Sequence, residues 1–203
     1  MLYLWHPNYL RNDAANVCQR GFLTLLVFVL PLCAHAELEG FDIVRVDPQW
    51  VDDTYHVNAV VSYTLSPEAL EALKSGVTLG FRVDLIIKQE KRYWLDENVA
   101  VLKQQYRLRY HALSDQYILT NVNSGAVNNF PTLSGALTVM GNIIALPVID
   151  RNMLGSSPNY IARMRARLEL DELPTPLRLL SYVKPGWRLA SEWRTWNVTL
   201  SND

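Results

Sequence analysis

The sequence predicts a mainly β protein, an antiparallel two-sheet sandwich of immunoglobulin-like architecture with two short helical insertions. Many short segments after residue 36 alternate apolar and polar residues, and only two segments have helical spacing. Alternation with a period of two is typical of strands that bury one face. Helices do not alternate regularly with these strands, which argues against a parallel α/β sheet. A closed β-barrel is the alternative that the same pattern allows.

The strands follow from this alternation, segment by segment. The first is expected over 41–46 and is interrupted at Asp47-Pro48, because proline lacks the N–H that a strand ladder uses. Asp52-Asp53 then reads as a turn. Later strands are expected over 55–65, 77–87, 93–105 with 106–112 (one long strand or two bent ones), 116–121, 161–170 and 196–200.

The first helix has a clear beginning and end in the sequence. Ser66 is a good N-cap residue, and Pro67 suits the first helical position. Glu68 and Lys74 carry the charges that the two ends of the helix dipole favour. Gly76 stands where a helix commonly stops.

A second helix is expected after Pro131-Thr132. Its apolar stripe consists of Leu133, Leu137, Met140 and Ile144, a spacing typical of an amphipathic helix. Farther along, three prolines argue against continuous secondary structure before the last strand. They are Pro174, Pro176 and Pro185.

The start of the chain has the layout of a secretory signal peptide. Arg20 precedes an apolar run over 22–32 that Pro31 interrupts near its end, and Ala34 and Ala36 supply the small residues that a signal peptidase accepts. We therefore expect cleavage after Ala36 and a mature protein in the periplasm.

The expected organisation is an N-terminal extension with signal peptide, 1–36, followed by a single sandwich domain, 37–203. The alternative is a retained anchor in the inner membrane, but a bilayer span needs about 20 apolar residues and the run here is shorter. Because a signal peptide does not need the residues before Arg20, the true start is hypothesised to lie after Met1, near Val17.

Charge and cysteine content exclude several classes of function. The chain carries 19 Lys and Arg and 20 Asp and Glu, a balance that gives no reason to expect nucleic-acid binding. Both cysteines, Cys18 and Cys33, precede the expected cleavage site. The mature domain would then be cysteine-free, without disulfides, thiol catalysis or cysteine metal sites.

Two predicted strands carry arginines on one face. Alternation places Arg163, Arg165 and Arg167 on the same side of one strand, and Arg107 and Arg109 on the same side of another. If these strands were neighbours, they would form a basic sheet face. Such a face would suit an anionic ligand or an envelope protein, because arginine binds carboxylates and phosphates through two parallel hydrogen bonds. The commoner interpretation is a solvated face with cross-strand ion pairs.

Three tryptophans near the C-terminus allow a similar choice. Trp187, Trp193 and Trp196 lie close together in the chain. A cluster of aromatic residues can bind a sugar or a peptide. More often they are core anchors whose indole N–H groups are satisfied locally, and this is the interpretation we favour.

No catalytic, cofactor-binding or metal-binding motif is present. The two histidines of the expected mature chain, His56 and His111, lack the spacing of a zinc helix. An envelope glycan hydrolase would need two carboxylates across a cleft. Asp96 or Glu97 with Asp171 or Glu172 are the conceivable pairs, but nothing in the sequence brings them together.

Several stretches resemble a proteobacterial family known as "proline-rich signal peptide protein", a domain of unknown function. They are SPEALEALKSGVTLGFRVDLII, YRLRYHALSDQYIL, LPTPLR and SEWRTW. The resemblance implies a periplasmic protein of Gram-negative bacteria, often encoded beside a nitrogen-regulation-type sensor kinase. It implies no catalytic residues.

The expected function is therefore a non-enzymatic binding or regulatory module that is exported and linked to envelope signalling. Its partner would be an envelope protein or an anionic ligand, with membrane contact only through an uncleaved signal segment. Two other classes stay open: the glycan hydrolase, and a membrane-anchored structural or assembly protein.

Overall fold

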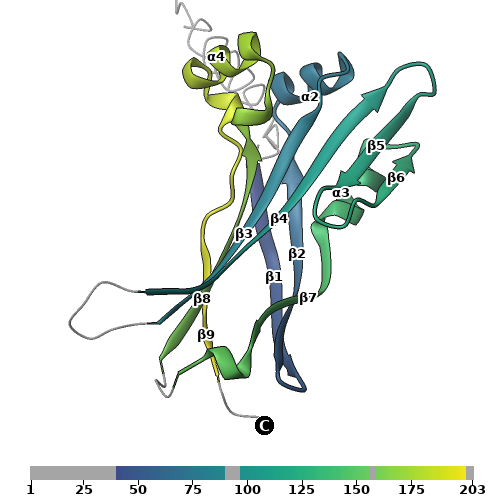
Figure 1. Cartoon of the computed structure of the whole chain (residues 1–203). Helices are drawn as coiled ribbons and strands as arrows, with labels where there is room; N and C mark the ends of the chain where they lie inside the picture. Colours follow the sequence, from purple (N-terminus) through teal and green to yellow (C-terminus); the bar gives the residue numbers. More distant parts are fainter. Residues whose placement is uncertain (1–39, 90–96, 156–158, 200–203) are drawn as a thin grey trace, which may run out of the picture. The chain divides into compact units, whose positions relative to one another are not determined.

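The computed structural model describes residues 40–89, 97–155 and 159–199, which belong to one compact unit, Glu37–Asp203. Its strands form two antiparallel sheets, one in the order β1-β2-β7 and one in the order β6-β5-β4-β3-β8-β9 (Figure 1). The predicted β-sandwich is confirmed. Across the residues described, the two sheets do not close into a barrel, so that alternative is wrong.

The small sheet consists of β1 (Gly40–Val51), β2 (Thr54–Thr64) and β7 (Asn142–Asp150). The predicted turn at Asp52-Asp53 connects β1 to β2, with Asp52 in the left-handed region at a φ of 53°. The expected break at Asp47-Pro48 is wrong, because β1 continues through it. Pro48 is tolerated since β1 lies at the edge of its sheet, where one side of the strand needs no ladder bonds.

The large sheet has β3 (Leu79–Gln89) near its centre, between β4 and β8. Its other members are β4 (Glu97–His111), β5 (Gln116–Asn121), β6 (Val127–Phe130), β8 (Tyr160–Glu169) and β9 (Arg194–Val198). The segment expected as one long strand or two bent ones is one strand, β4, within the residues described.

The core lies between the sheets and is built from the apolar face that alternation predicted. Phe41 and Tyr63 of the small sheet contact Phe81 of the large sheet, with ring centroids 5.8 and 5.6 Å apart. Toward the other end, the indole N–H of Trp196 donates to the Tyr55 hydroxyl at 3.0 Å. These contacts fix the two sheets face to face.

The first predicted helix is confirmed as α2 (Pro67–Lys74). The Ser66 hydroxyl accepts a hydrogen bond from the backbone N–H of Ala69 at 3.2 Å, and Pro67 opens the helix. Its inward face buries Ala69, Ala72 and Leu73.

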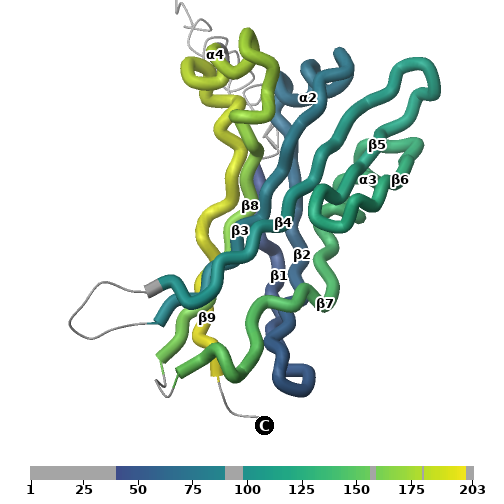
Figure 2. Tube along the Cα trace, viewed as in Figure 1, coloured from purple at the N-terminus to yellow at the C-terminus, as the bar shows by residue number. Residues whose placement is uncertain are grey.

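The second helix is shorter than its expected stripe. It is α3 (Leu133–Gly141), capped by Thr132, and the chain enters β7 directly after it. Ile144, the last residue of the predicted stripe, lies in β7 and is 72% exposed. Strands β6 and β7 were not predicted, because the first is only 4 residues long and bulges in the second break its alternation. Figure 2 follows the chain from α3 through β7 toward the β1–β2 hairpin.

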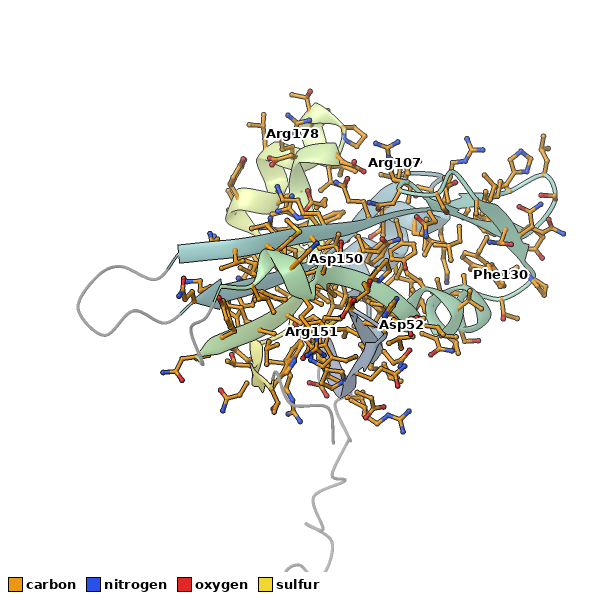
Figure 3. The ribbon with its side chains drawn as sticks, turned by 60° about the horizontal axis from the view of Figure 1, so that its bottom comes forward. Asp52, Arg107, Phe130, Asp150, Arg151 and Arg178 are labelled. Carbon is orange, nitrogen blue, oxygen red and sulfur yellow. The ribbon has the colours of Figure 1, made fainter. Side chains whose placement is uncertain are left out.

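That hairpin end of the small sheet is held by polar contacts between β7 and the β1–β2 turn. The Thr54 hydroxyl donates to Asp150 Oδ1 at 2.8 Å, and the backbone N–H of Arg151 donates to the Asp53 carbonyl at 2.7 Å. Figure 3 shows Asp150 and Arg151 beside Asp52 at this end.

A third α-helix occupies the proline-rich segment, so the expectation of no continuous structure there is wrong. It is α4 (Thr175–Val183), with Pro176 as its second residue. A proline in the first turn removes an N–H that has no helical partner in any case, so it costs no hydrogen bond. Two short 3-10 helices flank α4, η2 (Leu170–Glu172) and η3 (Pro185–Trp187), while a third, η1 (Arg151–Met153), follows β7.

Candidate functional site

The five predicted arginines all project from the outer face of the large sheet. Their strands are not neighbours, however, because β3 lies between β4 and β8. The register places Arg82 of β3 opposite Gln105 on one side and Arg167 on the other. Since Phe81 and Val83 point into the core, Arg82 and Asp84 share the outer face with the arginines.

The middle of this face is a network of opposite charges. Arg82 Nε lies 3.2 Å from Asp84 Oδ1 and 2.9 Å from Glu169 Oε1. Arg167 Nε lies 3.2 Å from Asp84 Oδ2 and 3.4 Å from the same Glu169 oxygen. The side chains of Arg82, Asp84 and Glu169 are 16%, 12% and 11% exposed. Two arginines and two carboxylates thus compensate one another in a half-buried cluster, which we call the central ion cluster.

Arg107 is also compensated, by Glu172 of η2. Its Nε and Nη2 donate to the two oxygens of this carboxylate at 3.2 and 3.0 Å. These hydrogen bonds and the charge of Glu172 raise the pKa of Arg107. A Cβ at Gly80 would overlap the Glu172 carboxylate, so a glycine on the central strand leaves room for this pair. Figure 3 shows Arg107 on β4.

The β9 side of the face differs, because Arg163 and Arg165 are held by an aromatic ring and a backbone carbonyl, although Asp84 lies opposite Arg165 in the register. The Arg163 guanidinium lies 3.7 Å from the ring centre of Trp193, and that of Arg165 lies 5.8 Å from it. Arg165 Nε donates to the Ser191 carbonyl at 3.2 Å. Within the described ranges, no carboxylate forms an ion pair with either of them. We call Arg163, Arg165 and Trp193 the cationic aromatic cluster.

The segment before β9 holds this cluster in place. The Ser191 hydroxyl accepts from the backbone N–H of Ala166 at 3.0 Å, and the backbone N–H of Ser191 donates to the Ala166 carbonyl at 2.8 Å. The Leu189 carbonyl likewise accepts a hydrogen bond from the backbone N–H of Leu168 at 2.8 Å. The chain therefore runs along the edge of β8 and fixes Trp193 under the two arginines.

Arg109 lies beyond the start of β3 and is exposed. Its strand neighbour is Ile118 of β5. The structure thus places the five predicted arginines on one face but in different situations: Arg107 and Arg167 are paired with carboxylates, while Arg109, Arg163 and Arg165 form no ion pair among the residues described.

The pKa of Glu169 is raised from its ordinary value of 4.5, mainly by desolvation on burial and against the opposing effect of Arg82. At pH values between the ordinary pKa and the raised pKa, Glu169 is therefore more protonated in the native state than in the unfolded state. Its contribution to stability is present at lower pH and is lost as the pH rises through the native pKa. We expect the stability advantage of the wild type over Glu169→Gln to be larger near about pH 4 than near about pH 7. Urea unfolding of both proteins across this range measures it. An advantage that grows with pH would show that the attraction of Arg82 and Arg167 outweighs burial.

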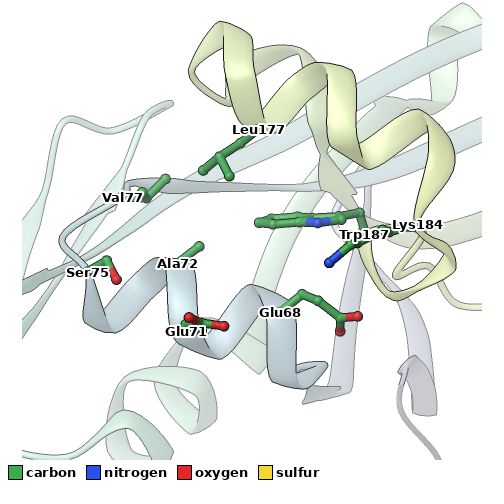
Figure 4. Close-up of a pocket in the computed structure, with 8 residues that line it drawn as sticks. All are labelled: Glu68, Glu71, Ala72, Ser75, Val77, Leu177, Lys184 and Trp187. Atoms are coloured by element: carbon green, nitrogen blue, oxygen red, sulfur yellow. The ribbon is translucent and has the colours of Figure 1, made fainter.

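A pocket of about 270 Å³ lies where α2 faces α4 and η3 (Figure 4). Its apolar lining consists of Ala72, Val77, Leu177 and Trp187, and its polar lining of Glu68, Glu71, Ser75 and Lys184. Trp187 is only 3% exposed. A Cβ at Gly186 would overlap the Glu68 carboxylate, so this glycine lets the carboxylate lie against η3. The sequence argument did not find this pocket, because its two walls are about 100 residues apart in the chain.

The three tryptophans divide between the two interpretations. Trp187 is buried and Trp196 is tied to Tyr55, as core anchors would be. Trp193 is half-exposed and supports two arginines on the surface.

The structure does not bring together those carboxylates of the conceivable hydrolase pairs that lie among the described residues. The backbone of Glu97 pairs with Gln89 at one end of β3, whereas η2, which carries Asp171 and Glu172, follows Glu169 at the other end, opposite Gly80. The length of β3 separates them by about 30 Å, far more than the about 5–10 Å between catalytic carboxyl groups in glycosidases. Asp96 lies outside the described residues, as do Arg20, Ala34 and Ala36 of the predicted signal peptide.

The fold and the site together define a β-sandwich domain with a charged sheet face. The chain belongs to the family described as Domain of unknown function (DUF4390), whose model matches residues 39–197. Membership of an uncharacterised family is thus confirmed. No curated protein and no solved structure matches the chain. Among the residues that the structure describes, no helix has both the length and the apolar character required to cross a bilayer.

Proposed function

We propose that the protein is an exported, non-enzymatic binding module that captures an anionic partner in the periplasm of a Gram-negative bacterium. Export rests on the leader of residues 20–36, which has a basic flank, a short apolar run and small residues before the cleavage point. The resemblance to the proteobacterial family called "proline-rich signal peptide protein" supports the same compartment and a link to envelope signalling.

The observation that carries this proposal is the cationic aromatic cluster. Elsewhere on the outer face, Asp84, Glu169 and Glu172 neutralise Arg82, Arg107 and Arg167, while Arg109 is exposed and lies away from any aromatic ring that the structure pairs with a cation. At Arg163 and Arg165 two guanidinium groups stand beside one indole ring and form no ion pair among the described residues, because the carboxylate of Asp84, opposite Arg165 in the register, is paired with Arg82 and Arg167. A carboxylate or phosphate from a partner would supply the missing charge, and bidentate hydrogen bonds would fix its orientation.

The partner surface is tested by reversing these charges. A photo-crosslinking amino acid at Thr195, which is exposed and pairs with Arg163, reports what approaches the cluster in cells. We expect Arg163→Glu/Arg165→Glu to reduce cross-linked product about tenfold or more, because each hydrogen bond to a charged group contributes about 1.5 kcal/mol or more. Circular dichroism of the purified variant checks that it folds.

The matched control reverses two cations elsewhere. Arg45→Glu/Lys74→Glu makes the same change in net charge on β1 and α2 and should leave the product unchanged. Equal losses in both double variants would mean that the cluster is not the binding surface. Fractionation of the same cells tests export: a periplasmic product beginning at Glu37 supports cleavage, and full-length protein in the inner membrane supports the anchored alternative.

A further inference from the structure

The pocket between α2, α4 and η3 brings three charged groups to an apolar cavity without pairing them. Glu68 and Glu71 approach it from α2, and Lys184 approaches from the segment between α4 and η3 (Figure 4). All three residues are described, yet the ammonium of Lys184 forms no ion pair with either carboxylate. Because Glu71 and Lys184 are exposed and Glu68 is partly buried, the pocket presents opposite charges at its open side, where a ligand can reach them.

The buried indole of Trp187 is a second, independent feature of this pocket. It lies across the cavity between the two helices (Figure 4), and 3% of the residue is exposed. Buried tryptophans normally donate their N–H to a partner. The indole N–H of Trp187 forms no hydrogen bond within the described part of the chain and is not one of its fully buried polar groups, so the pocket contains a reachable hydrogen-bond donor as well as an aromatic surface.

We propose that this pocket binds a small aliphatic zwitterion with the chemistry of an amino acid or a dipeptide. This inference goes beyond the proposed function, since the cationic aromatic cluster lies on the outer face of the large sheet and shares no residue with the pocket. The volume of about 270 Å³ lies just below the usual size range of ligand sites, which favours a small molecule.

Each part of such a ligand has a partner in the lining. Glu68 and Glu71 accept hydrogen bonds from the ligand ammonium, which relieves the repulsion between two carboxylates on one helix face. Lys184 and the indole N–H of Trp187 donate to the ligand carboxylate. Ala72, Val77 and Leu177 contact the aliphatic side chain. A ligand with a single charge would use only one side of this arrangement and would therefore form fewer charge-assisted hydrogen bonds than a zwitterion.

The test uses L-leucine as the probe and the protein labelled with ¹⁵N. We expect leucine to shift the indole N–H resonance of Trp187 in a saturable way. N-acetyl-L-leucine lacks the ammonium, and L-leucine methyl ester lacks the carboxylate. Each should bind about tenfold or more weakly than leucine. The dipeptide L-leucyl-L-alanine distinguishes the two sources, since tighter binding than leucine identifies the pocket as a peptide site.

Variants separate the polar contacts from simple hydrophobic binding. Glu68→Gln/Glu71→Gln and Lys184→Met should each weaken leucine binding about tenfold, while Glu192→Gln, outside the pocket, should leave it unchanged. No shift of the Trp187 resonance at about 10 mM leucine would overturn the proposal, as would equal binding of leucine, its ester and its N-acetyl form. Arg163→Glu/Arg165→Glu should not affect leucine binding, so failure of one proposal is distinguishable from failure of the other.

Discussion

Replacing Gly141 by alanine is expected to destabilise the domain by about 3 kcal/mol, because the added methyl group has no room. Gly141 is the last residue of α3 and packs against β2. A Cβ there would overlap the backbone carbonyl oxygen of Val61 and lie 3.2 Å from its carbon. A strand backbone inside a paired sheet cannot move aside as a flexible side chain can. Accommodation would shift α3 away from the small sheet.

Gly135 in the same helix is the matched control. A Cβ at this position would lie 3.1 Å from Thr132 Oγ1 and 3.7 Å from Phe130 Cδ1, both of which belong to side chains. Alanine also favours a helix over glycine by about 1 kcal/mol, so Gly135→Ala should change stability by less than about 1 kcal/mol. Urea unfolding followed by circular dichroism measures both variants. Similar stabilities for the two would mean that α3 does not lie so close to β2.

The second large effect is expected at Asp84, in the central ion cluster. Asp84→Asn removes one of two carboxylates that face two arginines and leaves Arg82 and Arg167 to share Glu169. Removing one partner from a buried ionic group costs about 3 kcal/mol, because a charge stays desolvated without compensation. We therefore expect a loss of that size in the free energy of unfolding at neutral pH, measured by urea denaturation.

An exposed ion pair shows what burial contributes. Arg45 and Asp47 of β1 lie 2.9 Å apart, but their side chains are 69% and 54% exposed. Such pairs contribute about 0–1 kcal/mol, so Asp47→Asn should cost at most about 0.5 kcal/mol. If Asp84→Asn proved equally mild, water would have to reach the cluster, and the outer face would bind anions more readily than its pairing implies.

Capping residues and alternation predicted those elements whose boundaries depend only on a few neighbouring residues. Helix α2 has its cap, first-turn proline and stop within one short segment, and β2 alternates along its whole length. Helix α4 was missed because its prolines were read as breakers, although Pro176 occupies a first turn. In β7, the bulges, Pro147 and the positive φ of Ala145 disrupt alternation, so only pairing with β2 defines the strand.

On the arginine face, too, local sequence predicted some features and long-range packing decided the others. Alternation alone predicted which side of each strand the arginines share, because the side-chain period of a strand is fixed. It could not predict that β3 would insert Arg82 and Asp84 between them, nor that Glu172 would reach Arg107. That Arg163 and Arg165 form no ion pair among the described residues follows only from these long-range neighbours.

The amino-acid sequence by itself determined the β class, the inward face of most strands and the outward direction of the arginines, because these depend on periodicity within one segment. Strand order, the neutralisation of part of the charged face and the pocket between α2 and η3 were decided by tertiary structure. Each of these depends on which distant segments pack together, and that choice is made by the whole core rather than by any single stretch of chain.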